Sequence, residues 1–225
     1  MSGYKILRLQ GLTYPGAEDI AYKSNPKLSE SPYRIQKEAI LSQKIVYSEG
    51  FSNAMRALGN DAHEILFDCE RLQKTWARER NFQYKADKWQ LEIVLGQINE
   101  ICPDVLYFQD IFSLPVTVRK SIKELCPYIR LVIIQKGYPG ETRDFSDADI
   151  LLVSSPILFR RYLRQNPYLI YHSFDAEILN RLRQRGDLPQ SQDYELVFAG
   201  SSRAPESRYW ALKELAEKTR VEMWV

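Results

Sequence analysis

The sequence predicts an α/β protein built on a parallel β-sheet with helices on both faces. Two observations support this prediction. Short, almost continuous runs of Val, Ile and Leu recur along the chain, and segments with helical periodicity lie between them. Strands buried on both faces show such continuous apolar runs, whereas half-exposed strands alternate apolar and polar residues. Because crossovers between parallel strands are right-handed, the expected architecture is a doubly wound sheet.

The expected elements alternate in order. Strands are expected at 4–9, 63–69, 104–109, 130–135, 149–154, 168–172, 195–200 and 221–225. Helices are expected at 33–58, 70–88, 89–101, 116–125, 157–164 and 207–218. Residues 12–32 contain prolines and Gly16 among polar residues, so they are expected to form a loop. Gly59-Asn60 is a suitable pair to end the long helix.

A change in composition divides the chain. Residues 180–193, NRLRQRGDLPQSQD, combine three arginines with Gly, Pro and polar residues, which is typical of a helix end followed by a linker. We expect a first domain over residues 1–180, a linker over 181–193 and the beginning of a second domain over 194–225. One strand–helix–strand unit leaves most of its apolar faces open, so this second unit is expected to be incomplete.

The composition excludes several classes of protein. The chain has 225 residues, 44% hydrophobic and 27% charged, with 31 Lys+Arg against 29 Asp+Glu. Because the net charge is only +2, a dedicated nucleic-acid binder is not expected. In the basic, aromatic stretch 70–88, acidic residues interrupt the positive charge, which favours a solvated helix over a nucleic-acid patch. No apolar run is long enough to span a bilayer, and the N-terminus lacks a signal peptide, so a cytoplasmic location is expected.

Cysteine and histidine usage gives no sign of a metal centre. Cys69, Cys102 and Cys126 lack metal-binding or redox spacing and are expected to be reduced, buried thiols. Only His63 and His172 are present, which excludes a His-rich site. No Asp-x-Asp pair follows a strand, so no metal is expected.

Residues that directly follow the strands are candidate site residues, since open parallel sheets bind ligands at the edge formed by the carboxyl ends of their strands. Asp110 is a candidate general base, although an Asp in this position also suits a helix N-cap or a turn. His172 precedes Ser173 and Asp175, but no Gly-x-Ser-x-Gly elbow is present, so a binding or capping role is expected rather than hydrolase chemistry. The full set of post-strand residues is Gly11, Asp68, Asp110, Lys136-Gly137, Ser154-Ser155, His172 and Gly200-Ser201.

Phosphate-binding signals are weak in the first domain and stronger in the second. Neither G-x-G-x-x-G nor G-x-x-x-x-G-K-[ST] is present, which argues against a nicotinamide dehydrogenase or a P-loop enzyme. Gly200, Ser201 and Arg203 lie between a strand and a helix, and Arg208 follows. Backbone N–H groups, the helix dipole and a guanidinium suit an anion there, although a solvated surface arginine is the alternative.

The order of three motifs resembles bacterial two-Rossmann (GT-B) glycosyltransferases, in particular the family 1/4-like and spore-maturation-type group. The motifs are LQKTWARERN at 72–81 followed by PDVLYFQD at 103–110, then YHSFDAEIL at 171–179, then ELVFAGSS at 195–202 with a helix carrying Arg208 and the strand VEMWV. The resemblance implies a Rossmann-like N-terminal acceptor domain and a C-terminal donor domain, with sugar transfer between them.

By this resemblance, Gly11 lies near the donor phosphates, and Asp110 or His172 lines the acceptor side. Gly200, Ser201 and Arg203 or Arg208 begin the donor site. The substrates implied are a nucleotide-sugar donor, needing no further cofactor, and a glycan, lipid-linked or protein acceptor. The chain stops before the acidic residue that grips the donor ribose in this family and lacks its Lys-Gly pair. We therefore expect the chain alone to be inactive. The alternatives are a non-catalytic Rossmann-like module that binds a ligand or a protein and, less favoured, a sugar-nucleotide epimerase.

Overall fold

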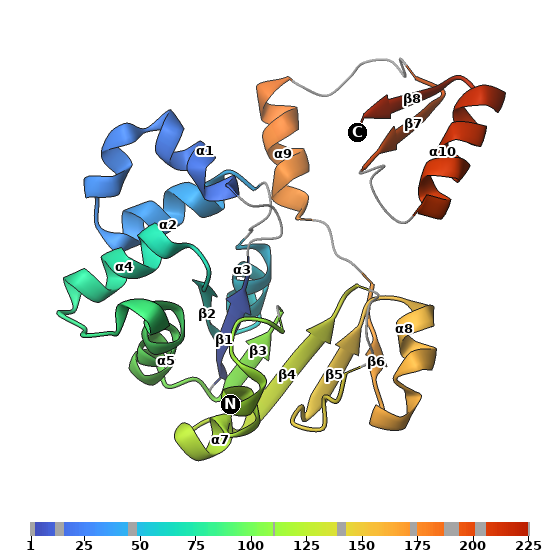
Figure 1. Cartoon of the computed structure of the whole chain (residues 1–225). Coiled ribbons are helices and arrows are strands. Elements are labelled where there is room, and N and C mark those ends of the chain that lie inside the picture. The colour runs from blue at the N-terminus through green and yellow to red at the C-terminus, as the bar shows by residue number, and fades with distance from the viewer. Residues whose placement is uncertain are drawn as a thin grey trace. The chain divides into compact units, whose positions relative to one another are not determined.

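The chain forms two compact units, Met1–Asp175 and Ala176–Val225, here called unit 1 and unit 2 (Figure 1). The computed structural model describes residues 3–11, 16–44, 49–109, 111–138, 143–171, 175–186, 194–200 and 206–224.

A six-stranded sheet forms the centre of unit 1. The strands lie in the order β2-β1-β3-β4-β5-β6, and every neighbouring pair is parallel. Its strands are β1 (Lys5–Gln10), β2 (Asp61–Leu66), β3 (Val105–Phe108), β4 (Leu131–Lys136), β5 (Ile150–Val153) and β6 (Tyr168–Leu169). The predicted parallel α/β sheet is therefore confirmed, and its arrangement is consistent with a Rossmann-like fold.

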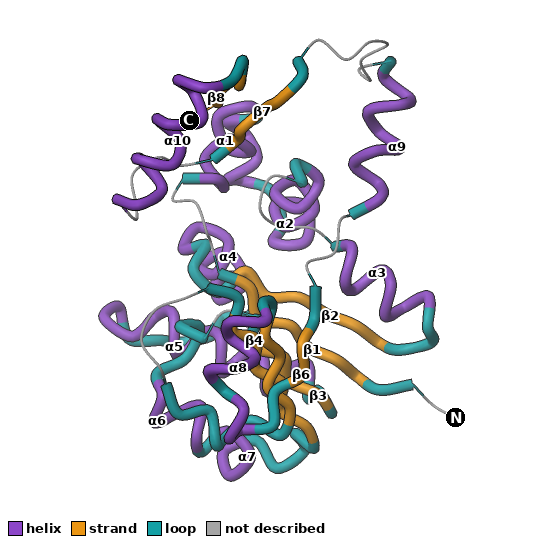
Figure 2. The backbone as a smooth tube through the Cα atoms, turned by 90° about the vertical axis from the view of Figure 1, so that its right-hand side faces the viewer, coloured by secondary structure: helices purple, strands orange, loops and turns teal. Residues whose placement is uncertain are grey.

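Helices cover both faces of this sheet, as Figure 2 shows from the side. The helices of unit 1 are α1 (Ala17–Ser24), η1 (Pro26–Glu30), α2 (Tyr33–Ser42), α3 (Gly50–Ala57), α4 (Glu70–Glu79), η2 (Ala86–Lys88), α5 (Trp89–Ile101), α6 (Val116–Lys120), α7 (Ile122–Leu125), α8 (Pro156–Arg161) and η3 (Leu163–Gln165). Phe51 and Met55 of α3 pack on Ile6 of β1, on the face here called face A. The largest core lies on the opposite face, face B, where α5, α7 and α8 pack on Leu7, Leu9 and their neighbours.

Residues 12–32 do not form the predicted loop, because α1 and η1 lie within them. Gly16 takes a left-handed φ of +81° just before α1, and Glu18 and Asp19 lie in its first turn, where acidic side chains favour a helix. Tyr22 and Leu28 are buried in a cluster shared with α2 and α4. Burial against neighbouring helices outweighs the local turn signals, so the prediction of a loop was wrong.

The long helix predicted over residues 33–58 is two helices, α2 and α3. Lys44 takes a left-handed φ of +55°, which a continuing α-helix excludes. The two helices also bury different surfaces: α2 packs beside α4, whereas α3 packs on face A of the sheet. The predicted end of the segment is confirmed, since Gly59 follows α3 with φ +84°.

Smaller differences concern the helix predicted over residues 116–125 and one thiol. The helix predicted over 116–125 breaks at Ser121 into α6 and α7. Cys69 and Cys126 are buried as predicted, but Cys102 is exposed, because it lies past the end of α5 in a left-handed conformation.

Unit 2 contains a parallel strand–helix–strand element. It consists of α9 (Ala176–Arg185), β7 (Leu196–Ala199), α10 (Glu206–Lys218) and β8 (Val221–Trp224), with β7 paired to β8. The strand–helix–strand order agrees with the sequence analysis. Because α9 continues to Arg185, residues 181–185 of the expected linker are helical, and residues 187–193 lie outside the described residues. Leu196, Val197 and Trp224 remain exposed within the described residues, so this small sheet leaves apolar surface open.

Candidate functional site

The strand order of unit 1 indicates where a ligand is expected to bind. From β1 the chain crosses to β2 on one side, and from β2 it crosses back past β1 to β3 on the other side. This reversal places a topological switch point between β1 and β3, where open α/β sheets bind ligands beyond the carboxyl ends of the strands. Leu9 is in register with Phe108, so Gln10-Gly11 and Gln109 flank the switch point.

Gln10, the last residue of β1, brings an unsatisfied polar group to this position. Its side chain lies on face A, the residue is only 4% exposed, and Nε2 has no hydrogen-bond partner among the described residues. Leaving a buried amide donor unpaired costs about 1–3 kcal/mol. Such a donor beside a switch point is suited to donate a hydrogen bond to a ligand oxygen, because binding would satisfy it.

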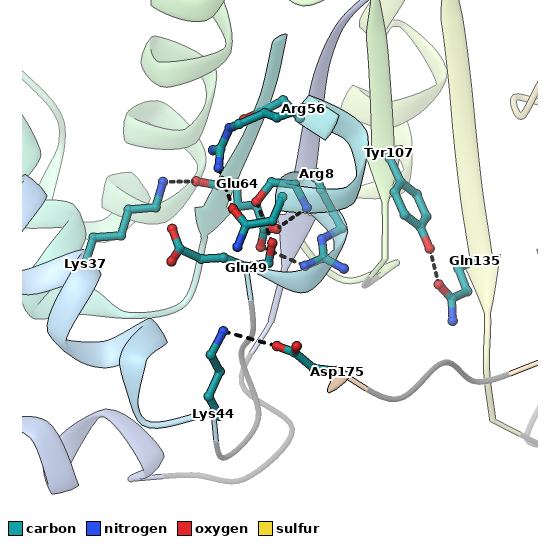
Figure 3. Close-up of polar contacts among 12 residues, drawn as sticks. Arg8, Lys37, Lys44, Glu49, Arg56, Glu64, Tyr107, Gln135 and Asp175 are labelled. Carbon is teal, nitrogen blue, oxygen red and sulfur yellow. Dashed lines mark hydrogen bonds and ion pairs between the residues drawn. The ribbon is translucent and has the colours of Figure 1, made fainter. Parts of the chain in front are cut away.

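Two further hydrogen bonds order the carboxyl edge beside Gln10. The Tyr107 hydroxyl on β3 donates to Oε1 of Gln135 on β4 (Figure 3). Burial raises the pKa of Tyr107 above its ordinary value, so the phenol stays protonated and remains a donor. On the next strand connection, Ser154 Oγ donates to the Gly137 carbonyl at 2.9 Å. On face A, this edge therefore presents neutral, hydrogen-bonding groups from three neighbouring strands.

An ion-pair network lies deeper on face A (Figure 3). Arg8 Nη2 on β1 is 2.7 Å from Glu64 Oε2 on β2, and the side chains are 10% and 2% exposed. The Ser52 N–H at the start of α3 donates to Glu64 Oε1 at 3.2 Å, and Lys37 Nζ of α2 donates to the Glu64 carbonyl at 2.5 Å. Burial lowers the pKa of Lys37, and the Glu64 and Glu49 carboxylates oppose that shift. This network joins α2 and α3 to the sheet, so its role is structural.

Cavities formed by described residues lie at both edges of the sheet. One, of about 490 Å³, is bounded by the segment after β3, the start of α5 and Arg143, and it lies at the carboxyl edge. The other, of about 340 Å³, is bounded by Lys5, Asp61 and Ile101, at the first residues of β1 and β2 and the last residue of α5. The second cavity therefore lies at the amino edge, and the first is the better candidate for a ligand.

The residues singled out from the sequence are distributed over both units. Gly11 follows β1 at the switch point, as the carboxyl-edge rule predicts. Gly200 follows β7, where its N–H donates to the Trp224 carbonyl at 3.0 Å, and Arg208 is exposed in the first turn of α10. Asp110, His172, Ser201 and Arg203 lie outside the described residues.

The structure adds Gln10, Gln135 and Arg143 to the candidate site. Gln10 and Gln135 are polar residues at the ends of apolar strands, which is a signal that the sequence contains. Arg143 lies in a connection with no distinctive motif, and only the three-dimensional structure places it beside the residues that follow β3.

No protein-family model, curated protein or solved structure matches this chain. Within the described ranges, no three His, Cys, Asp or Glu side chains are grouped in a way that would hold a metal ion. In the same part of the chain, no helix has the length and apolar character needed to cross a membrane.

Proposed function

We propose that this chain forms the acceptor-binding part and the beginning of the donor-binding part of a GT-B glycosyltransferase, which transfers a sugar from a nucleotide-sugar to a glycan or another acceptor. The observation that supports the proposal is the succession of two parallel β/α units. A six-stranded sheet with a switch point is followed by the β7–α10–β8 element. Two such units in one chain are what the resemblance in motif order implies.

The proposed roles follow from the positions after the strands. Gly11 allows close approach of a ligand to the backbone at the end of β1, near the donor phosphates. Asp110 and His172 line the acceptor side, with Asp110 as the candidate base for an acceptor hydroxyl. In unit 2, Gly200, Ser201 and Arg203 begin the donor site. Arg208 lies in the first turn of the 13-residue helix α10, where its guanidinium and the helix dipole both favour an anionic diphosphate.

Calorimetric titration tests this proposal directly. The chain is titrated with UDP-, GDP-, ADP- and dTDP-sugars, and we expect saturable binding of at least one of them. Arg208→Gln should weaken that binding about tenfold or more, because a charged hydrogen-bonding partner of the diphosphate is lost. Arg220→Gln, at another exposed arginine of unit 2, serves as the matched control and should bind like the wild type. Absence of binding for all four nucleotide-sugars, or equal binding by Arg208→Gln, contradicts the proposal.

A non-catalytic ligand-binding module is the second candidate. The observation that favours it is the carboxyl-edge cavity, whose lining residues all belong to unit 1. This alternative predicts a ligand that binds unit 1 with an affinity that Arg208→Gln does not change.

A further inference from the structure

Four side chains at the carboxyl edge form a continuous stack on the loops after β3 and β4, here called the basic–aromatic stack. Lys136 Nζ lies 3.7 Å from the centre of the Tyr138 ring. The Tyr138 ring is stacked on Phe112, with centroids 6.3 Å apart and an interplanar angle of 23°. Arg143 Cζ lies 4.9 Å from the centre of the Phe112 ring. Two cations therefore flank a pair of aromatic rings.

Neither cation of the stack is neutralised by the part of the chain that the structure describes. Lys136 is only 1% exposed, yet no described carboxylate lies within ion-pair distance of it or of Arg143. Burial lowers the pKa of Lys136, and the positive charges of Arg143 and Arg161 lower it further. A buried cation is ordinarily paired with an anion, and an aromatic ring supplies only part of that stabilisation. The local surplus of positive charge is what an anionic ligand would neutralise.

Two members of the stack line the carboxyl-edge cavity. Phe112 and Arg143 border this space of about 490 Å³, together with Trp89 and Gln90 at the beginning of α5. Its size is that of a site for a small molecule. Asp87 and Lys88 also line it, and their opposite charges offset one another, so the positive character of the cavity comes from the stack.

We propose that this cavity binds the phosphate group of a phosphorylated small molecule, with Arg143 as the direct ligand and Lys136 supplying charge from behind the Tyr138 ring. A guanidinium can donate two parallel hydrogen bonds to phosphate oxygens, which a single ammonium cannot. Phe112 and Trp89 are placed to contact the remainder of the ligand. The binding site does not depend on the glycosyltransferase proposal; only the identification of its ligand as a phosphorylated acceptor rests on the proposed function.

Calorimetry with simple phosphates tests the site. The probes are inorganic pyrophosphate, glucose 6-phosphate and vesicles of phosphatidylcholine with phosphatidic acid, the last measured by co-sedimentation. We expect saturable binding of pyrophosphate or glucose 6-phosphate, weakened about 10- to 100-fold in both Arg143→Gln and Lys136→Met. Arg78→Gln, which removes an exposed arginine on α4, is the matched control and should bind normally. Binding only to the vesicles, lost in the same two variants, would assign the same phosphate chemistry to a lipid headgroup.

A stability readout separates an anion site from a merely structural lysine. Without phosphate, Lys136→Met should melt at a higher temperature than the wild type, because it removes an unneutralised buried charge. Millimolar pyrophosphate should raise the melting temperature of the wild type by more than it raises that of Lys136→Met. The proposal is overturned if none of the three probes binds, if Arg78→Gln loses as much affinity as Arg143→Gln, or if Lys136→Met melts lower than the wild type. Because none of the probes carries a nucleoside and the variants lie in unit 1, failure here leaves the Arg208 test of the donor site unaffected.

Discussion

Arg8 Nη2 and Glu64 Oε2 are 2.7 Å apart in the interior of unit 1, where they join the two neighbouring strands β1 and β2 on face A. Arg8 also lies 4.7 Å from the centre of the Phe51 ring of α3, and Glu64 accepts a hydrogen bond from the α3 backbone. A charged pair therefore lies where most residues of the sheet are apolar, and it holds α3 against the strands.

Glu64→Gln should lower the free energy of unfolding by about 3 kcal/mol or more, because it removes a buried carboxylate that lies 2.7 Å from the Arg8 guanidinium. Urea denaturation measures this effect. The control is Glu100→Gln, which breaks the partly exposed pair with Arg80 and should cost less than about 1 kcal/mol. Equal losses in the two variants would show that burial does not determine the strength of the Arg8–Glu64 pair.

Gln10→Met should leave the fold as stable as the wild type or raise its free energy of unfolding by about 1 kcal/mol. Methionine has a similar length and brings no polar atom that needs a partner, whereas Gln10 Nε2 is buried without one. The same variant should bind the nucleotide-sugar less tightly. A loss of stability above about 1 kcal/mol in urea would mean that the Gln10 amide is satisfied in the folded protein.

The stability of the protein should fall as the pH rises above about 10, the ordinary pKa of tyrosine. Burial raises the pKa of Tyr33 in the folded state well above that value. Below pH 10 the Tyr33 phenol is protonated in both the folded and the unfolded chain. Above pH 10 it loses its proton only in the unfolded chain, which lowers the free energy of the unfolded chain relative to the folded one. Tyr33→Phe should therefore lose less stability between pH 9 and 11 than the wild type does, by urea denaturation at each pH. Tyr4→Phe, at an exposed position, should follow the wild type, and an unchanged slope in Tyr33→Phe would contradict the assignment.

Only one of the three cysteines should react quickly in the native protein. Cys102 is exposed, Cys69 and Cys126 are buried, and burial raises the pKa of the Cys69 thiol to about 12. Because the thiolate is the reactive form, Ellman's reagent should titrate about one thiol per chain before unfolding and three after it. Cys102→Ser should abolish the fast phase. A fast phase that survives in this variant would place a second thiol at the surface.

The strands of unit 1 could be predicted because strands buried on both faces consist almost entirely of apolar residues. Runs such as 131–134 are apolar on both faces, and α5 has the predicted bounds of 89–101 because its apolar periodicity is unbroken. The helix α1 could not be predicted in this way, since its eight residues carry strong turn signals at both ends and owe their stability to Tyr22 packing against α2 and α4. The break between α2 and α3 likewise depends on which surface each helix buries.

The candidate site could be predicted in part. The carboxyl-edge rule selected Gly11 and Lys136 from strand ends alone. The sequence does not contain the strand order, and only that order identifies β1 and β3 as the pair at the switch point. Arg143 lies 31 residues after Phe112 in the chain, so their stacking is a tertiary contact that no local pattern predicts.

If ligands bind at the carboxyl edge of the six-stranded sheet, backbone amide NMR of the chain titrated with a nucleoside diphosphate should locate them there. We expect shifts of the Gly11 and Gly137 amides in unit 1. The Asp61 and Asp104 amides, at the amino edge, should not move. Shifts confined to the amino edge, or the absence of any shift at saturating nucleoside diphosphate, would contradict binding at the carboxyl edge.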